Sequence, residues 1–151
     1  MGLEISEVDR ELLRENLTMI FHFAATTKFT EKYKKAIELN LRGVREILTL
    51  ASECKNLRLF CHLSTAYCNL SVPVLEEKVF KAPMDPNLAI AMAETFDEKT
   101  IETIFSNFES KDAVCSYNFT KTLAESLVAE FHEKFQLPVM ICRPAQVIPT
   151  N

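Results

Sequence analysis

Apolar residues along the chain gather in three short runs that are rich in β-forming side chains. These runs cover residues 17–25, 57–63 and 137–142, and polar residues bound each of them. Short apolar runs of this kind are typical of strands that are buried on both faces of a parallel sheet. The sequence therefore predicts three buried strands.

Segments with helical spacing of apolar residues separate these runs. The predicted helices cover residues 6–16, 30–54, 87–108 and a segment that starts at Ser116. Ser6, Thr30 and Ser116 are the expected N-caps, and the proline-rich residues 72–86 are expected to form a loop. Strands that alternate with helices indicate βαβ units and a parallel sheet, which needs helices on both faces.

Composition is ordinary for a soluble globular domain and excludes some partners. The 151 residues suffice for one domain with a real core, and 48% of them are hydrophobic. A net charge of −4 without a basic patch argues against a nucleic-acid partner. The five cysteines are odd in number and lack Cys-x-x-Cys spacing, so we expect reduced thiols and no metal site.

The start of the chain shows no targeting signal. Met-Gly-Leu-Glu-Ile-Ser lacks the features of a signal peptide, and no apolar run approaches the roughly 20 residues of a membrane span. Gly2 and Ser6 match a myristoylation pattern, for which a chance match is the favoured interpretation. We therefore expect neither a targeting nor a transmembrane segment in this chain.

Small or polar residues follow each predicted strand. They are Ala24-Ala25-Thr26, Ser64-Thr65 and Arg143-Pro144-Ala145. In open parallel sheets the ligand crevice lies beyond the carboxyl ends of the strands. We therefore expect these three segments to converge on one site.

Tyr117 and Lys121 are four residues apart and would share one face of a helix. A free phenol has a pKa near 10, and a nearby ammonium favours its ionised form, which suits acid–base chemistry. Lys121 is also suited to contact a ribose hydroxyl, and Ser64 or Thr65 to hydrogen-bond a substrate carbonyl. A surface Tyr–Lys pair is the alternative interpretation, but the strand-end hydroxyls favour catalysis.

Glycine is scarce in this chain. Gly2 and Gly43 are the only two, whereas a dinucleotide pyrophosphate is usually held by a glycine-rich loop. We therefore expect the chain alone to bind such a cofactor poorly. Gly43 inside a predicted helix costs about 1 kcal/mol relative to alanine, which suggests close packing there.

Three polar residues within predicted elements have two interpretations each. His22 and His62 lie in predicted strands and are interpreted as satisfied core residues rather than ligands. Asn40 is a poor helix former in the middle of a predicted helix. It either faces solvent or bonds through its amide to the backbone of a neighbouring strand.

Six stretches carry a resemblance to a known family. They are residues 21–29, 39–45, 62–69, 76–86, 117–125 and 143–150. A Ser/Thr strand end, a Tyr-x-x-x-Lys motif and a mid-helix Asn resemble the extended short-chain dehydrogenase/reductase superfamily. The runs Ser-Thr-Ala-Tyr-Cys-Asn and Glu-Glu-Lys-Val-Phe are most similar to those of the alcohol-forming, male-sterility-type fatty acyl-CoA reductases.

The resemblance implies roles for individual residues. Tyr117 would be the proton donor, Lys121 would modulate its acidity, and Thr65, with Ser64 beside it, would orient the carbonyl. Asn40 would stabilise the architecture of the active site. The implied cofactor contacts are Ala24, Ala25, Thr26, Asn40, Tyr117, Lys121, Pro144, Ala145 and Val147.

The resemblance also implies a fold and an activity. The fold would be α/β, a partial Rossmann-like parallel sheet with flanking helices that lacks the N-terminal glycine-rich βα units. Residues 1–151 would be the central part of an NAD(P)-binding reductase domain, incomplete at both ends. The whole enzyme would use NADPH to reduce long-chain acyl-CoA through the aldehyde to the alcohol. It would work at the cytosolic face of endoplasmic reticulum or peroxisomal membranes, held there by regions outside this chain.

Two other functions stay open on the sequence alone. One is an inactive remnant of a reductase that serves as an interaction module, and the other is a reductase of a different carbonyl or thioester. Without the first strands of the family's fold, one edge of the sheet would be uncovered, so we expect the isolated chain to be marginally folded or to associate.

Overall fold

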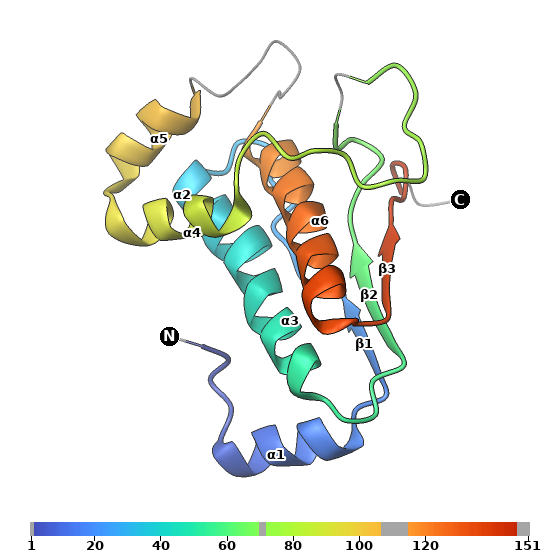
Figure 1. The fold of residues 1–151 in the computed structure, drawn as a ribbon. Coiled ribbons are helices and arrows are strands. Elements are labelled where there is room, and N and C mark those ends of the chain that lie inside the picture. The colour runs from blue at the N-terminus through green and yellow to red at the C-terminus, as the bar shows by residue number, and fades with distance from the viewer. Residues whose placement is uncertain (1, 70–71, 107–114, 148–151) are drawn as a thin grey trace, which may run out of the picture.

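Three strands form a parallel sheet in the order β1-β2-β3 in the computed structural model, which describes residues 2–69, 72–106 and 115–147 (Figure 1). The strands are β1 (Met19–His22), β2 (Leu59–Leu63) and β3 (Val139–Cys142). All three predicted strands are confirmed, although each is shorter than its apolar run. The expected α/β fold with a parallel sheet is confirmed as well.

Helices connect the strands. They are α1 (Glu7–Asn16), α2 (Tyr33–Ile37), the π-helical segment η1 (Glu38–Arg42), α3 (Gly43–Glu53), α4 (Pro86–Thr95), α5 (Glu98–Ser106) and α6 (Ser116–Phe135). The connection from β1 to β2 runs through α2, η1 and α3, and the connection from β2 to β3 runs through α4, α5 and α6. Helices α3 and α6 lie on the same side of the sheet (Figure 1).

The helix ends follow local capping chemistry, which corrects some of the expected boundaries. Ser6 accepts a hydrogen bond from Asp9 N at 3.1 Å and caps α1, as predicted. The expected caps at Thr30 and Ser116 are wrong, because the N-caps are Lys32 and Cys115. The Ser116 hydroxyl instead donates to Glu31 O at 2.7 Å, so that it ties α6 to the segment before α2.

The helix predicted over residues 87–108 is two helices. Phe96 has extended backbone and ends α4, and Asp97 Oδ1 accepts a hydrogen bond from Thr100 N at 2.9 Å at the start of α5. An aspartate that caps a new helix competes with continuation of the old one. The last two residues of the predicted helix lie outside the described residues.

Gly43 does not mark a close approach. A Cβ atom at Gly43 would meet Glu38 O at 3.9 Å, which is ordinary van der Waals contact. The expectation of close packing at this residue is therefore wrong.

Only one face of the sheet is covered by helices in the described part of the chain, which corrects the expectation of two covered faces. Phe60 is fully buried on the covered face, with Ile20 and Val139 packed beside it. The alternate side chains of the edge strands point to the other face, where Met19, Phe21 and Met140 are 52%, 57% and 43% exposed. We call the first the covered face and the second the open face.

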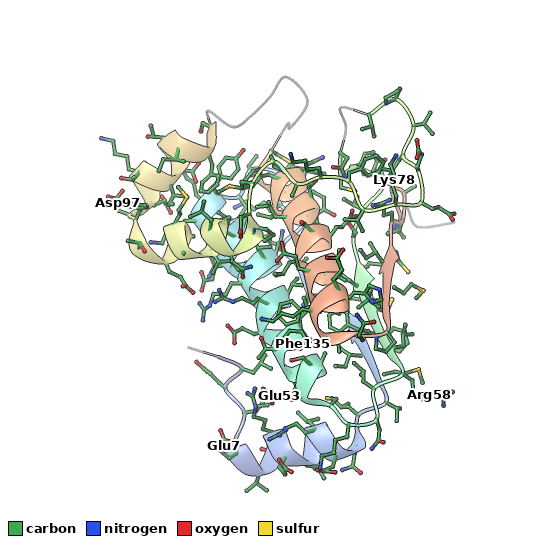
Figure 2. The ribbon with its side chains drawn as sticks, viewed as in Figure 1. Glu7, Glu53, Arg58, Lys78, Asp97 and Phe135 are labelled. Carbon is green, nitrogen blue, oxygen red and sulfur yellow. The ribbon has the colours of Figure 1, made fainter. Side chains whose placement is uncertain are left out.

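The two ends of the sheet differ in what surrounds them. Arg58 precedes β2 at the amino end of the sheet, and Lys78 belongs to the loop beside the carboxyl end of β3 (Figure 2). Near the amino end, α1 is held to α3 by an ion pair of 2.7 Å between Arg10 Nη2 and Glu53 Oε1. The candidate chemistry lies at the carboxyl end.

Candidate active site at the carboxyl end of the sheet

Helix α6 carries Tyr117 and Lys121 on its buried amino-terminal half. Residues 116–125 of this helix are all buried, although many of them are polar. Lys121 is only 4% exposed, and lysine is rarely buried to this extent without a partner. The alternative of a solvent-facing Tyr–Lys pair is therefore wrong.

The partner of Lys121 is the end of strand β2. Its Nζ donates a hydrogen bond to Leu63 O at 2.7 Å, and Leu63 is the last residue of β2. Burial lowers the pKa of Lys121 to about 8, although the nearby Glu125 carboxylate raises it. Lys121 is therefore a cation near neutral pH, fixed at the point where the strand passes into Ser64 and Thr65.

Tyr117 meets the segment that follows β1. Its ring packs edge-on against Phe29, with ring centroids 5.3 Å apart. Because Phe29 belongs to the segment between β1 and α2, this contact brings the end of the first strand to the same place as α6.

The two hydroxyls at the end of β2 have different environments. Thr65 Oγ1 accepts a hydrogen bond from Tyr67 N at 3.2 Å, which leaves its own proton available for a ligand. Ser64 Oγ donates to Glu125 Oε1 at 2.5 Å, beneath the site. Of the two, Thr65 is therefore the one suited to orient a substrate carbonyl.

Asn40 links η1 to the segment after β1. It is buried, its Oδ1 accepts from Thr26 N at 2.8 Å, and its Nδ2 donates to Thr26 O at 3.1 Å. The same Nδ2 donates to Thr120 Oγ1 at 3.2 Å, beside Lys121. The solvent-facing alternative for Asn40 is wrong, and its amide bonds to backbone just beyond the strand. π-Helical turns are frequent at functional sites.

The other expected cofactor contacts lie at the same end of the sheet but are less enclosed. Ala66 N donates to Pro144 O at 2.9 Å, which continues the pairing of β2 and β3 beyond their ends. Ala24 and Ala145 are exposed, whereas Ala25 is half-buried. Val147 is 86% exposed. The structure therefore brings Pro144 to the segment that follows β2 and leaves Val147 open to solvent.

Glu125 and Arg143 form an ion pair in which Glu125 is the residue that sequence reasoning did not assign to the site. Arg143 Nη2 lies 2.6 Å from Glu125 Oε2, and Arg143 Nε donates to Oε1 at 2.8 Å. This hydrogen bonding raises the pKa of Arg143. The available signal was spacing, because Glu125 follows Lys121 by one helical turn on the same buried face.

His22 and His62 are core residues, as the sequence predicts, but the expectation that they are satisfied is wrong. Within the described residues, His22 Nδ1 and both ring nitrogens of His62 are buried without a hydrogen-bond partner. Their rings stack with centroids 5.5 Å apart on the covered face, and both residues are buried. Burial lowers the pKa of His62 to about 3, with the positive charge of Lys121 acting in the same direction. Both rings are therefore neutral near physiological pH.

A parallel sheet with a Tyr-x-x-x-Lys helix and a threonine at the carboxyl end of the central strand defines part of a Rossmann-type domain of the short-chain dehydrogenase/reductase kind. The pattern of the Male sterility protein family matches residues 1–150. The chain belongs to that family, and the sequence-based assignment is confirmed.

Relatives of known name agree with this family. The chain is 38% identical to the fatty acyl-CoA reductase wat of Drosophila melanogaster, over 99% of this chain and 28% of the relative. It is 36% identical to fatty acyl-CoA reductase 1 of Homo sapiens, over 96% of this chain and 28% of the relative. The prediction that the chain comes from a family of reductases is thus confirmed. The chain spans less than a third of the length of these relatives.

A solved structure supports the fold alone. UDP-glucuronic acid 4-epimerase from Bacillus cereus, in complex with UDP-glucuronic acid and NAD, matches 95% of this chain with a TM-score of 0.60. The two are 17% identical, and the match covers 37% of the epimerase chain. The partial Rossmann-like sheet inferred from the sequence is therefore confirmed.

Two further searches of the molecule gave no additional site. No helix within the described ranges is long and apolar enough to cross a membrane. Across the same ranges, no three His, Cys, Asp or Glu side chains gather in a way that would hold a metal ion.

Proposed function

We propose that the protein containing this chain reduces long-chain fatty acyl-CoA with NADPH, through the aldehyde to the primary alcohol. The observation that carries the proposal is the placement of Lys121. Its buried ammonium is fixed at the end of β2, next to Thr65 and one helical turn from Tyr117. The relatives that are named as fatty acyl-CoA reductases supply the substrate class.

The residues present fit the nicotinamide end of a dinucleotide. Lys121 can donate to a ribose hydroxyl because its ammonium carries two protons besides the one bonded to Leu63 O at the end of β2. NADPH would supply hydride to the carbonyl carbon. With two glycines in the sequence, this chain offers no glycine-rich loop for the pyrophosphate.

Each catalytic residue has a defined task in this proposal. Thr65 donates its hydroxyl proton in a hydrogen bond to the substrate carbonyl oxygen and so fixes its position. Tyr117 transfers a proton to that oxygen as negative charge develops there. Lys121 stabilises the negative charge left on the phenol oxygen. Return of that proton to the Tyr117 phenolate, with loss of CoA as its thiolate, gives the aldehyde. With a second hydride, which a second NADPH would supply, Tyr117 then protonates the aldehyde oxygen to give the alcohol.

The location of the whole protein is part of the same proposal. We propose the cytosolic face of the endoplasmic reticulum or of peroxisomes, where acyl-CoA substrates are available, with membrane attachment through regions outside residues 1–151. Fluorescent tagging of the longest protein that contains this chain, with membrane fractionation, tests this placement.

Tyr117→Phe in the longest protein that contains this chain tests the reaction. Removal of the proton donor should lower kcat for a long-chain acyl-CoA by about 10²–10⁴-fold, measured by NADPH oxidation and chromatography of the alcohol. Tyr33→Phe is the matched control, because it removes a phenol in the core, against Phe105 and Phe119. A Tyr117→Phe protein that keeps kcat within a few-fold of the parent would overturn the proposal.

A further inference from the structure

The carboxylate of Glu125 is the centre of a buried polar network. Glu125 is 1% exposed, and its Oε1 accepts from Ser64 Oγ at 2.5 Å, from Cys68 Sγ at 3.2 Å and from Arg143 Nε at 2.8 Å. Its Oε2 accepts from Arg143 Nη2 at 2.6 Å. Each of these donors comes from outside α6.

Each partner of Glu125 belongs to a segment that builds the site. Ser64 directly precedes Thr65, and Arg143 directly precedes Pro144. Arg143 also donates from Nη1 to Glu76 O at 3.0 Å and from Nη2 to Lys78 O at 2.8 Å, so the loop after β2 is held by the same guanidinium. One carboxylate therefore joins α6, the ends of β2 and β3, and the loop beside them.

The network is stiff because its bonds are charge-assisted. Hydrogen bonds to a carboxylate are shorter and roughly twice as strong as neutral ones, and the two bonds from Arg143 fix the plane of the carboxylate. Cys68 remains a thiol donor, since burial raises its pKa to about 11. Stability alone does not require this arrangement, because a buried ion pair often gives no more stability than apolar residues of the same volume.

We propose that Glu125 is a positioning residue of the reductase, which holds Thr65 at its working distance from Tyr117 by fixing Ser64 and Arg143. Thr65 follows the end of β2 and Tyr117 lies on α6, so their separation depends on what joins β2 to α6. Glu125 joins them at the residue next to Thr65. The expected effect of Glu125 on kcat rests on the proposed function, whereas its effect on the structure at the end of β2 does not.

The kinetic test measures the effect of Glu125→Gln in the longest protein that contains this chain, once in the parent sequence and once in a Thr65→Val variant. Glutamine replaces one carboxylate oxygen with an NH2 group, which cannot accept the hydrogen bonds that Ser64 and Arg143 donate. The end of β2 must therefore shift. A shift of about 1 Å should lower kcat by about 10²-fold while KM for NADPH changes little. When Thr65 is already Val, Glu125→Gln should lower kcat by less than about 3-fold further, because the residue it positions is gone.

A purely structural role predicts a different pattern. Glu125→Gln would then lower activity by the same factor in the parent and in the Thr65→Val protein, and that equality would overturn the proposal. Glu133→Gln is the matched control, because Glu133 lies two turns further along α6 and is exposed. If Glu125→Gln does not fold, Ser64→Ala removes one donor, leaves the ion pair intact, and is measured in the same two backgrounds.

Amide hydrogen exchange separates this proposal from the proposed function. Ser64 N donates to Cys142 O at 2.7 Å and Tyr67 N to Thr65 Oγ1 at 3.2 Å, so both amides report on the end of β2. Glu125→Gln should speed their exchange more than that of Phe60 N, and Glu133→Gln should not. Unchanged protection would reject the role of Glu125 whether or not acyl-CoA is reduced. Absence of acyl-CoA reduction with faster exchange would reject only the proposed function.

Discussion

On the covered face of the sheet Phe60 is fully buried against α3 and α6, whereas on the open face Phe21 of the neighbouring strand is more than half exposed. Both residues are aromatic and lie in apolar runs that read alike in the sequence. What differs is whether a helix of this chain packs against them. The candidate site also depends on helices of this chain, because its polar residues are buried on them. Lys121 and Glu125 are buried residues of α6, and Asn40 is a buried residue of η1.

The largest expected effect is the difference between two phenylalanine truncations. Phe60→Ala should lower the free energy of unfolding by about 3–5 kcal/mol, since it leaves a cavity in the core. Phe21→Ala should lower it by less than about 1 kcal/mol, since the ring is already in solvent. Urea unfolding followed by circular dichroism measures both. Equal losses would show that the open face is covered in solution.

Asn40→Ala tests the polar part of the covered side. It leaves Thr26 N–H and Thr26 C=O without their partner, and each orphaned group costs about 1–3 kcal/mol. Asn56→Ala is the control, because Asn56 is exposed and its amide donates a hydrogen bond to Glu15 O. The same urea titration should give a loss for Asn40→Ala several times that for Asn56→Ala, and similar losses would contradict the role assigned to Asn40.

Acid should weaken the covered face through its buried histidines. Burial lowers the pKa of His62 to about 3 and lowers that of His22 as well. Histidine in the unfolded chain takes up a proton near pH 6.5, so the unfolded state binds more protons below that pH. Stability should be complete above about pH 6.5 and should fall by about 1.4 kcal/mol per pH unit below it for His62 alone.

Urea unfolding of the parent and of His62→Leu at about pH 5 and pH 7 measures that slope. His62→Leu should show the smaller loss of stability on acidification. His132→Gln is the control, because His132 is exposed near the end of α6. A parent chain that is equally stable at both pH values would contradict a buried, neutral His62.

The smallest expected effect concerns self-association through the open face. Met140 lies on the edge strand β3 and points to the open face, so Met140→Lys should weaken association of the isolated chain by about tenfold or less. Val8→Lys on the exposed side of α1 is the control. Sedimentation velocity over a range of concentrations measures both. An unchanged concentration dependence in Met140→Lys would mean that association does not use this face.

Local pattern was enough to predict the strands, the Tyr117–Lys121 face and the buried state of His22 and His62. It failed where distant residues decide. β1 ends at His22 rather than continuing along its apolar run, and the Thr26 backbone beyond it is bonded to the Asn40 side chain instead of to a strand. The sequence offered a bond from Asn40 to strand backbone as one of two alternatives, but it did not name Thr26 as the partner.

The same reason explains why Glu125 was overlooked. Its partners lie 61 residues before it, at Ser64, and 18 residues after it, at Arg143. A glutamate on a helix ordinarily indicates a solvated position. Only the three-dimensional arrangement shows that this one is buried among donors.

The π-helical segment η1 has a consequence for the length of the chain between β1 and β2. A π-turn accommodates one more residue than an α-turn, so residues 38–42 are equivalent to a single-residue insertion in an otherwise α-helical rod. Removal of one residue there would restore an unbroken α-helix and turn everything before it by about 100° relative to α3. The amide of Asn40 could then no longer face Thr26 and Thr120 together, so the aim of that amide is set by chain length as much as by residue type.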